Sequence, residues 1–467
     1  MTIRTIGPNS TYSSIDEAMA QAGPGDTFNL ESGYSNEAAT VTRNNATIFG
    51  EASSHGIELQ LAQGIATVTL TGHAPINIVD ASDGNGIVGN AGRNRITVSG
   101  GVDAVDGGLG VDRLVVDYRL AIGAITGDST SNFSEAGGGG RTVTMTDGTI
   151  EHFTILTGSG ADTITTGDGN DIIKTGNGAS TVSAGQGVNI IIGGRNSDTI
   201  TALDGGNVIH AGNGANSITS GGGDDIILSG IDADTIVSAG GEDRVTLRGG
   251  ADTVNAGAGN DRLIIDYSAM TTNVSGGITG GNHSTGYVGH IADVLVSSID
   301  FQRSERFDIT TGSGDDAVVT GDGSDVLRGS GGNDLLKSGG GRDDVFGGGG
   351  NDQIFGGLGA DLMRGGRGAD VFVFRAAVEA PIGMDHDVIK DFTIGTDSID
   401  LSAIDANSNR AGDQDFDYIG SEAFSSKAGE LHFRNGIVSG DMDGDGTADF
   451  AVEIADLAKL NGSDFIL

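Results

Sequence analysis

Aspartate recurs at a fixed spacing of nine residues near the end of this chain. Seven consecutive nine-residue units from 311 to 373 carry it at their sixth position, as Asp316, Asp325, Asp334, Asp343, Asp352, Asp361 and Asp370. Each unit also has an apolar eighth residue: Val318, Leu327, Leu336, Val345, Ile354, Met363 and Phe372. Evenly spaced carboxylates can bind a row of hard cations, so metal binding is the first chemistry that this pattern suggests.

The period of the repeat predicts how those carboxylates are positioned. Six glycine-rich residues can form a turn and three residues a short strand with one apolar side chain inward, so two units make one coil. Coils stack about 4.8 Å apart, which places aspartates of successive coils above one another. Two carboxylates about 5 Å apart repel by about 3 kcal/mol at a dielectric constant of about 20. A cation removes that penalty, and a shell of carboxylate and carbonyl oxygens favours Ca²⁺ over softer metals.

The same period continues through twelve units at 157–264 and four looser units at 80–115. All 23 eighth positions in the three blocks are Ile, Val, Leu, Met or Phe. A disordered Gly/Asp-rich tract is the alternative, but such a tract would not keep this pattern. We therefore predict an all-β fold, a right-handed parallel β-roll or β-helix solenoid with caps at both ends.

The blocks differ in the calcium sites that we predict. In the last block every sixth-position pair one coil apart is Asp with Asp, which gives five complete two-carboxylate sites. The middle block contributes Asp162, Asp171, Asp225, Asp234, Asp243, Asp252 and Asp261, but its complete pairs are only 225/243, 234/252 and 243/261. The first block adds Asp103 and Asp112. We expect about eight strong sites, with little or no calcium in the central coils at 175–223, where Asn189 and Asn207 would stack through side-chain hydrogen bonds.

A separate acidic loop lies near the C-terminus. The loop contains a glycine, Gly446, and four aspartates close to it in the sequence: Asp441, Asp443, Asp445 and Asp449. Three carboxylates at alternate positions can hold one calcium ion. Val452 stands where an EF-hand loop has its bidentate Glu. The loop is therefore either a compact calcium site or a solvated acidic turn.

Composition favours an extracellular protein with cationic partners. The 467 residues include 84 Gly, no Cys and no Trp, and the net charge is −39. The absence of cysteine excludes disulfides and thiol chemistry. The acidity disfavours nucleic acid as a partner, and no apolar run is long enough for membrane insertion. The first residues lack the apolar region of a cleaved signal peptide, so we expect export without an N-terminal signal.

The nonapeptides and the segment after them resemble a known family. Asp387-Val388-Ile389, Asp397-Ser398-Ile399 and the final Asp464-Phe465-Ile466-Leu467 are similar to the C-terminal domain of serralysin-type proteases. Together with the repeats, they resemble the RTX (repeats-in-toxin) proteins. The resemblance implies type I secretion directed by an uncleaved C-terminal signal, followed by folding in external calcium. The zinc motif His-Glu-x-x-His of serralysins is absent, so the resemblance implies no catalysis.

The other segments complete the predicted domain organisation. Residues 1–79 form an N-terminal cap with a helix near 12–22, and resemble the opening of a pectate-lyase or alginate-epimerase β-helix. Coils at 80–115, 157–264 and 311–373 are separated by inserts at 116–156 and 265–310, predicted as wider coils or projecting hairpins. Residues 374–467 form the C-terminal cap and secretion signal. Asp112-Arg113-Leu114 recurs as Asp261-Arg262-Leu263, which indicates a duplicated unit.

Three functions fit these features. The leading hypothesis is a secreted, calcium-binding structural protein of the cell surface or extracellular matrix, without enzyme activity. It would adhere to a cell-surface polysaccharide, or it would assemble with copies of itself into a surface layer or filament. The alternatives are a polysaccharide-modifying enzyme of the lyase or epimerase kind, and a secreted calcium-binding effector of host interaction.

Overall fold

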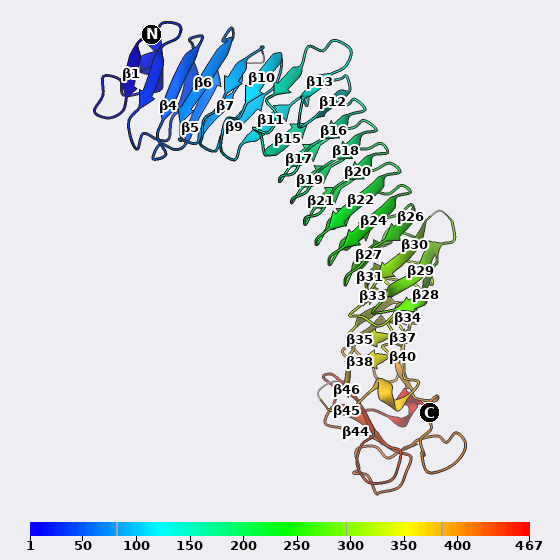
Figure 1. Ribbon diagram of the computed structural model, residues 1–467. Helices are drawn as coiled ribbons and strands as arrows, with labels where there is room; N and C mark the ends of the chain where they lie inside the picture. Colours follow the sequence, from blue (N-terminus) through cyan, green and yellow to red (C-terminus); the bar gives the residue numbers. More distant parts are fainter. Residues whose placement is uncertain (81–82, 296, 384–385) are drawn as a thin grey trace. The chain divides into compact units, whose positions relative to one another are not determined.

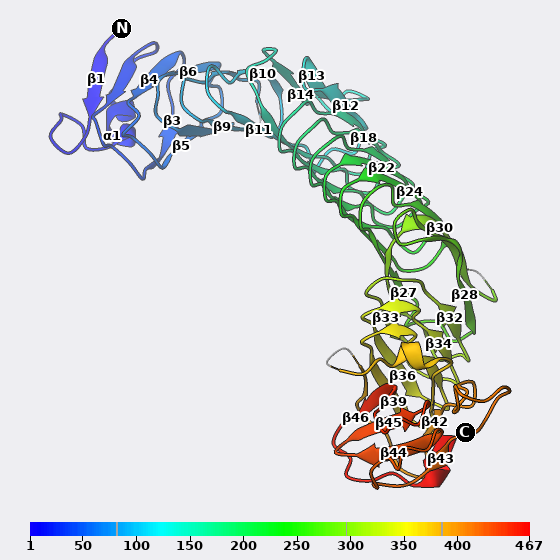
Figure 2. The ribbon, with the colours of Figure 1, turned by 60° about the horizontal axis from the view of Figure 1, so that its bottom comes forward.

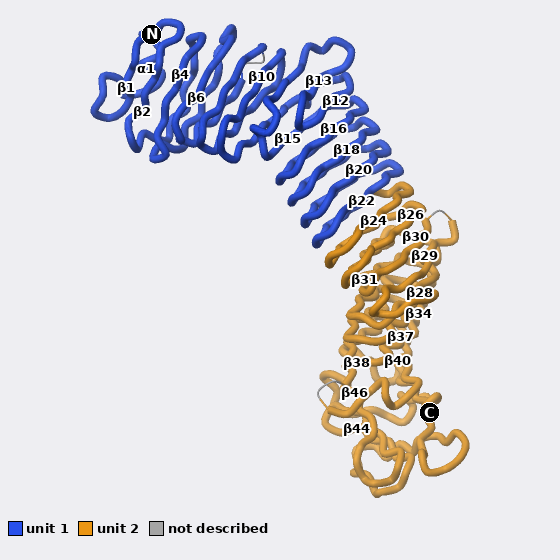
Figure 3. Tube along the Cα trace, in the orientation of Figure 1, with its two compact units in different colours: residues 1–229 blue, residues 230–467 orange. Residues whose placement is uncertain are grey.

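Two compact units make up the computed structural model, which describes residues 1–80, 83–295, 297–383 and 386–467. The units are residues 1–229 and 230–467 (Figure 3). In each, short strands alternate between two sheets, called sheet 1 and sheet 2 below (Figure 1). Most neighbouring strands are parallel, so the predicted all-β parallel solenoid is confirmed.

In the first unit, each coil adds one strand to each sheet. Sheet 1 contains, in spatial order, β1 (Ile3–Ile6), β2 (Thr27–Leu30), β4 (Ala46–Gly50), β6 (Thr67–Gly72), β8 (Gly86–Val88), β10 (Val102–Asp106), β14 (Thr142–Met145), β13 (Asn132–Glu135), β12 (Ile125–Asp128), β16 (Thr163–Thr165), β18 (Thr181–Ser183), β20 (Thr199–Thr201) and β22 (Ser217–Gly222). Sheet 2 contains β3 (Ala38–Val41), β5 (Ile57–Leu61), β7 (Ile76–Val79), β9 (Arg95–Val98), β11 (Arg113–Asp117), β15 (His152–Leu156), β17 (Ile172–Lys174), β19 (Ile190–Ile192), β21 (Val208–His210) and β23 (Ile226–Leu228).

The second unit repeats this plan and ends in antiparallel strands. Its sheet 1 contains β24 (Thr235–Gly240), β26 (Ala251–Asn255), β30 (Ser298–Ser304), β29 (Gly286–Asp293), β28 (Val274–Asn282), β32 (Ala317–Val319), β34 (Leu335–Lys337), β37 (Gln353–Phe355), β40 (Val371–Val373), β42 (Ser398–Asp400) and β47 (Phe465–Ile466). Its sheet 2 contains β25 (Arg244–Leu247), β27 (Arg262–Asp266), β31 (Arg306–Thr310), β33 (Val326–Arg328), β36 (Asp344–Gly349), β39 (Leu362–Arg367), β41 (Asp387–Ile389), β46 (Phe450–Ile454), β45 (Ile437–Asp441), β44 (Glu430–Arg434) and β43 (Asp417–Tyr418). A small pair, β35 (Gly340–Gly341) with β38 (Leu358–Gly359), and two 3₁₀ turns, η1 (Ala377–Glu379) and η2 (Gly462–Asp464), complete the unit.

The nonapeptide strands show why the eighth position is apolar. They are three to six residues long, with the eighth residue buried; in the three-residue strand β18, Val182 is buried between exposed Thr181 and half-buried Ser183. All 23 eighth-position side chains are buried. Neighbouring coils pair in register, so Ile173 lies beside Ile191. A narrow aliphatic ladder is therefore the core of the repeat blocks.

The first 79 residues belong to the same two sheets. Helix α1 (Ile15–Ala20) begins at Ser14, whose hydroxyl accepts a hydrogen bond from the Glu17 N–H, and it buries Ile15, Ala18 and Met19. Strands β1 to β7 pair in parallel like those of the nonapeptides, but with longer coils, since Thr47 pairs with Thr69. The N-terminal segment thus extends the solenoid as well as covering its end (Figure 2).

Both inserts form hairpins that lie within sheet 1. In the first unit, β13 is antiparallel to both β14 and β12, while those two strands pair in parallel with β10 and β16. In the second unit, β29 is antiparallel to β30 and β28 in the same way. The inserts were expected to be wider coils or projecting hairpins; in the structure their hairpin strands are paired on both sides within sheet 1. Each insert adds three strands to sheet 1 and one to sheet 2.

The run Ile190-Ile191-Ile192 provides a matched test of the core. Ile191 is fully buried, whereas Ile190 is 38% exposed. We expect Ile191→Ala to cost about 2–4 kcal/mol of unfolding free energy, because it leaves a cavity. Ile190→Ala should cost less than about 1 kcal/mol. Urea denaturation of both variants in calcium measures this, and equal losses would contradict the buried ladder.

Candidate metal centre

The sixth-position aspartates form two columns, one along each edge of the roll. In the last block, the Oδ1 atoms of Asp316 and Asp325 accept hydrogen bonds from the backbone N–H groups of Val274 and Phe307, while the Oδ1 atom of the later aspartate in each predicted pair accepts one from the backbone N–H of the sixth residue one coil earlier. These bonds join 316 to 334, 334 to 352 and 352 to 370 on one edge, and 325 to 343 and 343 to 361 on the other, at 2.8–2.9 Å. All five predicted pairs of this block therefore lie in adjacent coils.

The second carboxylate oxygen of these residues has no donor. In the last block, each of the seven aspartates is at most 2% exposed. Their Oδ2 atoms are buried without a hydrogen-bond partner within the described residues. A buried, uncompensated carboxylate oxygen is costly. A column of such atoms in adjacent coils is a set of acceptors that a cation would satisfy.

First-position glycines leave the space beside these oxygens open. A Cβ atom on Gly329 would lie 2.2 Å from Oδ2 of Asp334, and one on Gly347 would lie 2.3 Å from Oδ2 of Asp352. Gly365 has the same relation to Asp370. The glycine therefore has a steric reason to stand at the first position. The oxygen-only surroundings and this space fit a calcium ion held between turns.

Asparagine coils show what replaces the cation. The Nδ2 atom of Asn207 donates to the carbonyl oxygens of Leu203 and Gly205, at 3.0 and 2.7 Å, and its backbone N–H donates to Oδ1 of Asp225. Asn189 makes the corresponding bonds to Gly185 and Gly187. An amide nitrogen thus provides the donor that the aspartate coils lack. In the aspartate coils, the carbonyl oxygens at the equivalent positions of the turn would be free to bind the calcium ion.

Burial also disfavours the charged form of the column carboxylates. It raises the pKa of Asp343 and of Asp387 to about 8, and neighbouring carboxylates of the same column add to the effect. Burial likewise raises the pKa of Asp325 and Asp334 to about 7. Backbone N–H groups oppose the rise but do not cancel it. The cation-free columns therefore hold protons near neutral pH.

The middle and first blocks contain fewer acidic pairs. Asp234 and Asp243 donate their backbone N–H groups to Oδ1 of Asp252 and of Asp261. The predicted pair 225/243 joins residues of the two separate units and stays a prediction. Asp103, Asp112, Asp162 and Asp171 also occupy the columns, but their neighbours are Asn85, Asn94, Ser180 and Asn189. The second oxygen of Asp162 accepts from the Thr157 hydroxyl, which leaves it less suited to a cation.

Four acidic residues extend the columns beyond those predicted. Glu151 and Glu305, at the ends of the inserts, accept from the backbone N–H groups of Asp112 and Asp261. Asp387 and Asp397 accept from the N–H groups of Asp361 and Asp370, and the second oxygen of Asp387 is buried without a partner within the described residues. All four stand two residues before a buried apolar side chain, as the nonapeptide aspartates do. That signal was available in the sequence, but the altered spacing hid it.

The C-terminal acidic loop gathers three of its four carboxylates. Oxygens of Asp441, Asp443 and Asp449 lie within 4.8 Å of one another. Asp445 accepts instead from the N–H and hydroxyl of Thr447. Both oxygens of Asp441 already accept N–H groups, of Gly444 and Gly446. This geometry is compatible with a compact calcium site and with a solvated acidic turn. Calcium binding by the loop stays a prediction.

Asparagine substitution should convert a calcium coil into a cation-free coil. We expect Asp334→Asn with Asp352→Asn to lower the number of bound calcium ions and to raise the melting temperature in chelator, because each amide supplies the missing donor. Asp334→Ala with Asp352→Ala should lose calcium without that gain. Calcium titration and circular dichroism measure both effects. Unchanged calcium binding in the Asn variant would contradict the column assignment.

The raised pKa values give the calcium-free protein a defined pH dependence. The folded state binds protons up to about pH 7–8, as set by the pKa of Asp334 and of Asp343, whereas the unfolded carboxyls lose theirs near pH 4. Stability from these groups is therefore complete below about pH 4 and is lost as pH rises to about 8. We expect desalted protein to melt at a lower temperature at pH 8 than at pH 5, and calcium to stabilise it more at pH 8. A higher calcium-free melting temperature at pH 8 would refute this.

Comparison with known proteins agrees with this geometry. The family model described as "RTX calcium-binding nonapeptide repeat (4 copies)" matches residues 77–114, 154–182, 165–200, 183–213, 201–236, 228–263, 310–345 and 338–372. A search of curated proteins found no match. Within the described residues, no helix has the length and apolar character needed to cross a membrane. The repeats and the solenoid together place this chain in the RTX family of calcium-binding proteins.

Proposed function

We propose that this chain is a secreted structural protein of the cell surface or extracellular matrix, which becomes rigid when it meets external calcium. The main support for this proposal is that the columns of hydrogen-bonded sixth-position residues run through successive coils and include a residue from each insert. In the first unit the same bond links Asn94 to Asp112, and Asp112 to Glu151. Calcium would therefore bind to the scaffold itself, through about eight strong sites. A protein built in this way gains stiffness over its length from the ion.

Export by a type I secretion system fits the C-terminus under this proposal. The resemblance implies an uncleaved signal in the last four residues. In the folded chain Asp464 is buried, and Phe465 and Ile466 form β47, which pairs with β42. Recognition of these residues by the export machinery would have to precede folding. Low calcium inside the cell and high calcium outside would impose that order.

Self-assembly is supported by an aliphatic stripe on sheet 2 of the first unit. Ile190 and Ile226 are 38% and 47% exposed, and Ile192, Val208 and Leu228 are half-buried on the same outer face. Ile190, Val208 and Ile226 are neighbours in register along β19, β21 and β23, and Ile192 and Leu228 lie on either side of His210 in the second outward row. An uncharged apolar row on a strongly acidic protein is suited to contact with a second copy. We propose that this stripe, defined by these five residues, packs between copies in a layer or filament.

Light scattering on a sizing column, first in chelator and then in millimolar calcium, tests the proposal. We expect contraction on calcium addition, followed by growth in mass. The double variant Ile190→Asp with Ile226→Asp should still contract when calcium is added, but it should stay monomeric. Thr181→Asp with Thr199→Asp adds the same charge to the outer face of sheet 1 and should still assemble. Contraction at constant mass in the unmodified chain would refute assembly.

A further inference from the structure

Basic side chains stand next to one another on the outer face of sheet 2 in the first unit. Arg95, Arg113 and His152 begin β9, β11 and β15 and are direct neighbours across the three strands. Arg93 lies in the turn just before β9 and is exposed. Like charges directly opposite each other on adjacent strands destabilise a sheet. This chain has only 25 basic residues against 64 acidic ones, so such a cluster requires an explanation.

These residues line a hollow of about 510 Å³. Its walls also include Asn77 from β7 and Asn170 from the turn before β17. The Oδ1 atoms of both asparagines accept backbone N–H groups, of Arg95 and of Val188, which fixes the two amides. Their Nδ2 groups make no hydrogen bond within the described residues. The hollow therefore combines cationic groups with fixed neutral donors.

Neutral acceptors hold the guanidinium of Arg113 in place. Nη1 donates to the Phe153 carbonyl oxygen at 2.9 Å and to the Thr154 hydroxyl at 3.0 Å, and Nη2 donates to the Asn170 carbonyl oxygen at 2.8 Å. The ring of His152 is oriented too, because its Nδ1 accepts the Asn170 N–H. The charge of Arg113 is thus positioned but not neutralised by these partners.

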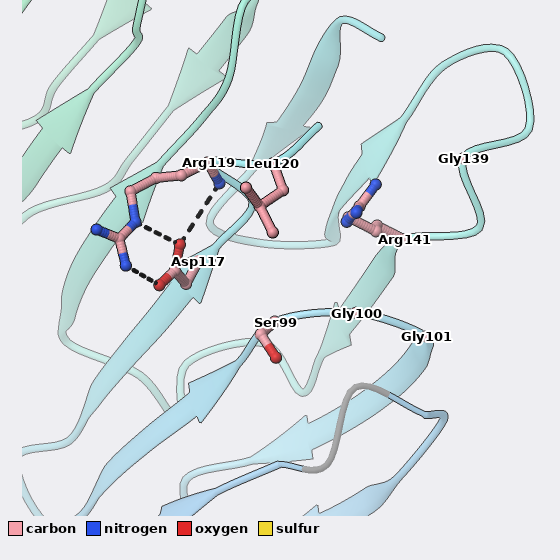
Figure 4. Close-up of a pocket in the computed structure, with 8 residues that line it drawn as sticks. All are labelled: Ser99, Gly100, Gly101, Asp117, Arg119, Leu120, Gly139 and Arg141. Atoms are coloured by element: carbon pink, nitrogen blue, oxygen red, sulfur yellow. Dashed lines mark hydrogen bonds and ion pairs between the residues drawn. The ribbon is translucent and has the colours of Figure 1, made fainter. Parts of the chain in front are cut away.

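Three other arginines of the first unit, Arg4, Arg119 and Arg141, are paired with carboxylates, whereas Arg43 donates to backbone carbonyl oxygens. Arg119 contacts Asp117 at 2.6 Å in the hollow of Figure 4, and Arg141, on the other side of that hollow, pairs with Glu135. Within the described residues, none of Arg93, Arg95 and Arg113 forms such an ion pair. Asp171 is the acidic group that acts most strongly on Arg113, and it lies in the column of sixth-position residues, next to Asn189.

The duplicated unit carries the same arrangement. Arg244, Arg262 and Arg306 begin β25, β27 and β31 and are neighbours in register. The Nε atoms of Arg262 and Arg306 are buried without a hydrogen-bond partner within the described residues. Two copies of a basic row, each beside an insert, are difficult to explain by stability, because the charges in a row repel. The hollow that Arg262 lines contains carboxylates of its own, including Asp325, Asp343 and Glu453. Among the described residues, no carboxylate lines the hollow of the first row, so a ligand that supplies negative charge would explain that row.

We propose that the hollow lined by Arg93, Arg95, Arg113 and His152 binds an anionic polysaccharide. Carboxylates carried on successive sugars would pair with the arginines, whose planar forks suit carboxylate oxygens. Sugar hydroxyls would accept from Asn77 and Asn170. The strongly acidic remainder of the chain repels broad polyanionic surfaces such as nucleic acid or an anionic membrane. A flexible, narrow chain can enter the hollow without approaching that remainder.

Calorimetric titration of the full chain in millimolar calcium with a short galacturonate oligomer tests this site. We expect binding that weakens as sodium chloride is added, and that falls at least tenfold in Arg93→Gln with Arg95→Gln. Both side chains are exposed, so this variant should fold normally. Arg195→Gln with Arg303→Gln removes two exposed arginines elsewhere and should bind as the unmodified chain does.

Three results would overturn the proposal. One is that the oligomer binds no better than a neutral oligosaccharide of equal length. Another is that the control variant loses as much affinity as Arg93→Gln with Arg95→Gln. The third is that vesicles of anionic lipid, rather than the oligomer, are bound in an Arg93- and Arg95-dependent manner. This inference rests on the proposed function, because it identifies the polysaccharide to which the surface protein would bind. The variant Ile190→Asp with Ile226→Asp, which should stay monomeric, can be titrated with the same oligomer. Failure of binding can therefore be distinguished from failure of assembly.

Discussion

The hydrogen bond from the backbone N–H of one sixth-position residue to the side-chain oxygen of the next coil determines most of this structure. It fixes the register between coils, because only an exact coil repeat places the acceptor under the donor, as between Asp334 and Asp352. It buries the side chain at the edge of the roll. It also occupies one carboxylate oxygen and leaves the other facing its own turn. Calcium binding is thus a consequence of how the coils are joined.

The choice between aspartate and asparagine at this position divides the solenoid into two kinds of coil. Asn189 and Asn207 satisfy their turns with their own amides and need no ion. Asp343 and its neighbours lack that donor and, without an ion, must bury charge or bind protons. In a linear array each coil is stabilised mainly by its neighbours. The asparagine coils can therefore form before calcium arrives and offer a template for the acidic coils beside them.

Much of this arrangement was predictable from the sequence, and what was missed has a common cause. The eighth-position rule identified the whole aliphatic ladder, and the period identified the five aspartate pairs of the last block. Glu151, Glu305, Asp387 and Asp397 escaped because the intervening chain is longer than one coil, so period alone could not align them. The pairing of β13 and β29 on both sides within sheet 1 escaped for a related reason. Their partners are set by which strands of sheet 1 are available on both sides, and no local pattern encodes that.

The fold constrains the first, sixth and eighth positions, which leaves the seventh and ninth free to carry function. Their residues are nevertheless sorted by sheet. On sheet 1 of the first unit, one outward row contains only hydroxyl side chains and continues in register through the antiparallel insert: Thr142, Ser134, Thr126, Thr163, Thr181, Thr199 and Ser217. On sheet 2 the corresponding rows hold arginines at one end and isoleucines at the other. Neither sheet needs this separation in order to fold, since every one of these side chains faces outward. The outer faces are therefore where the biological specificity of this RTX protein is to be sought, with the hydrogen-bonded columns holding them in register.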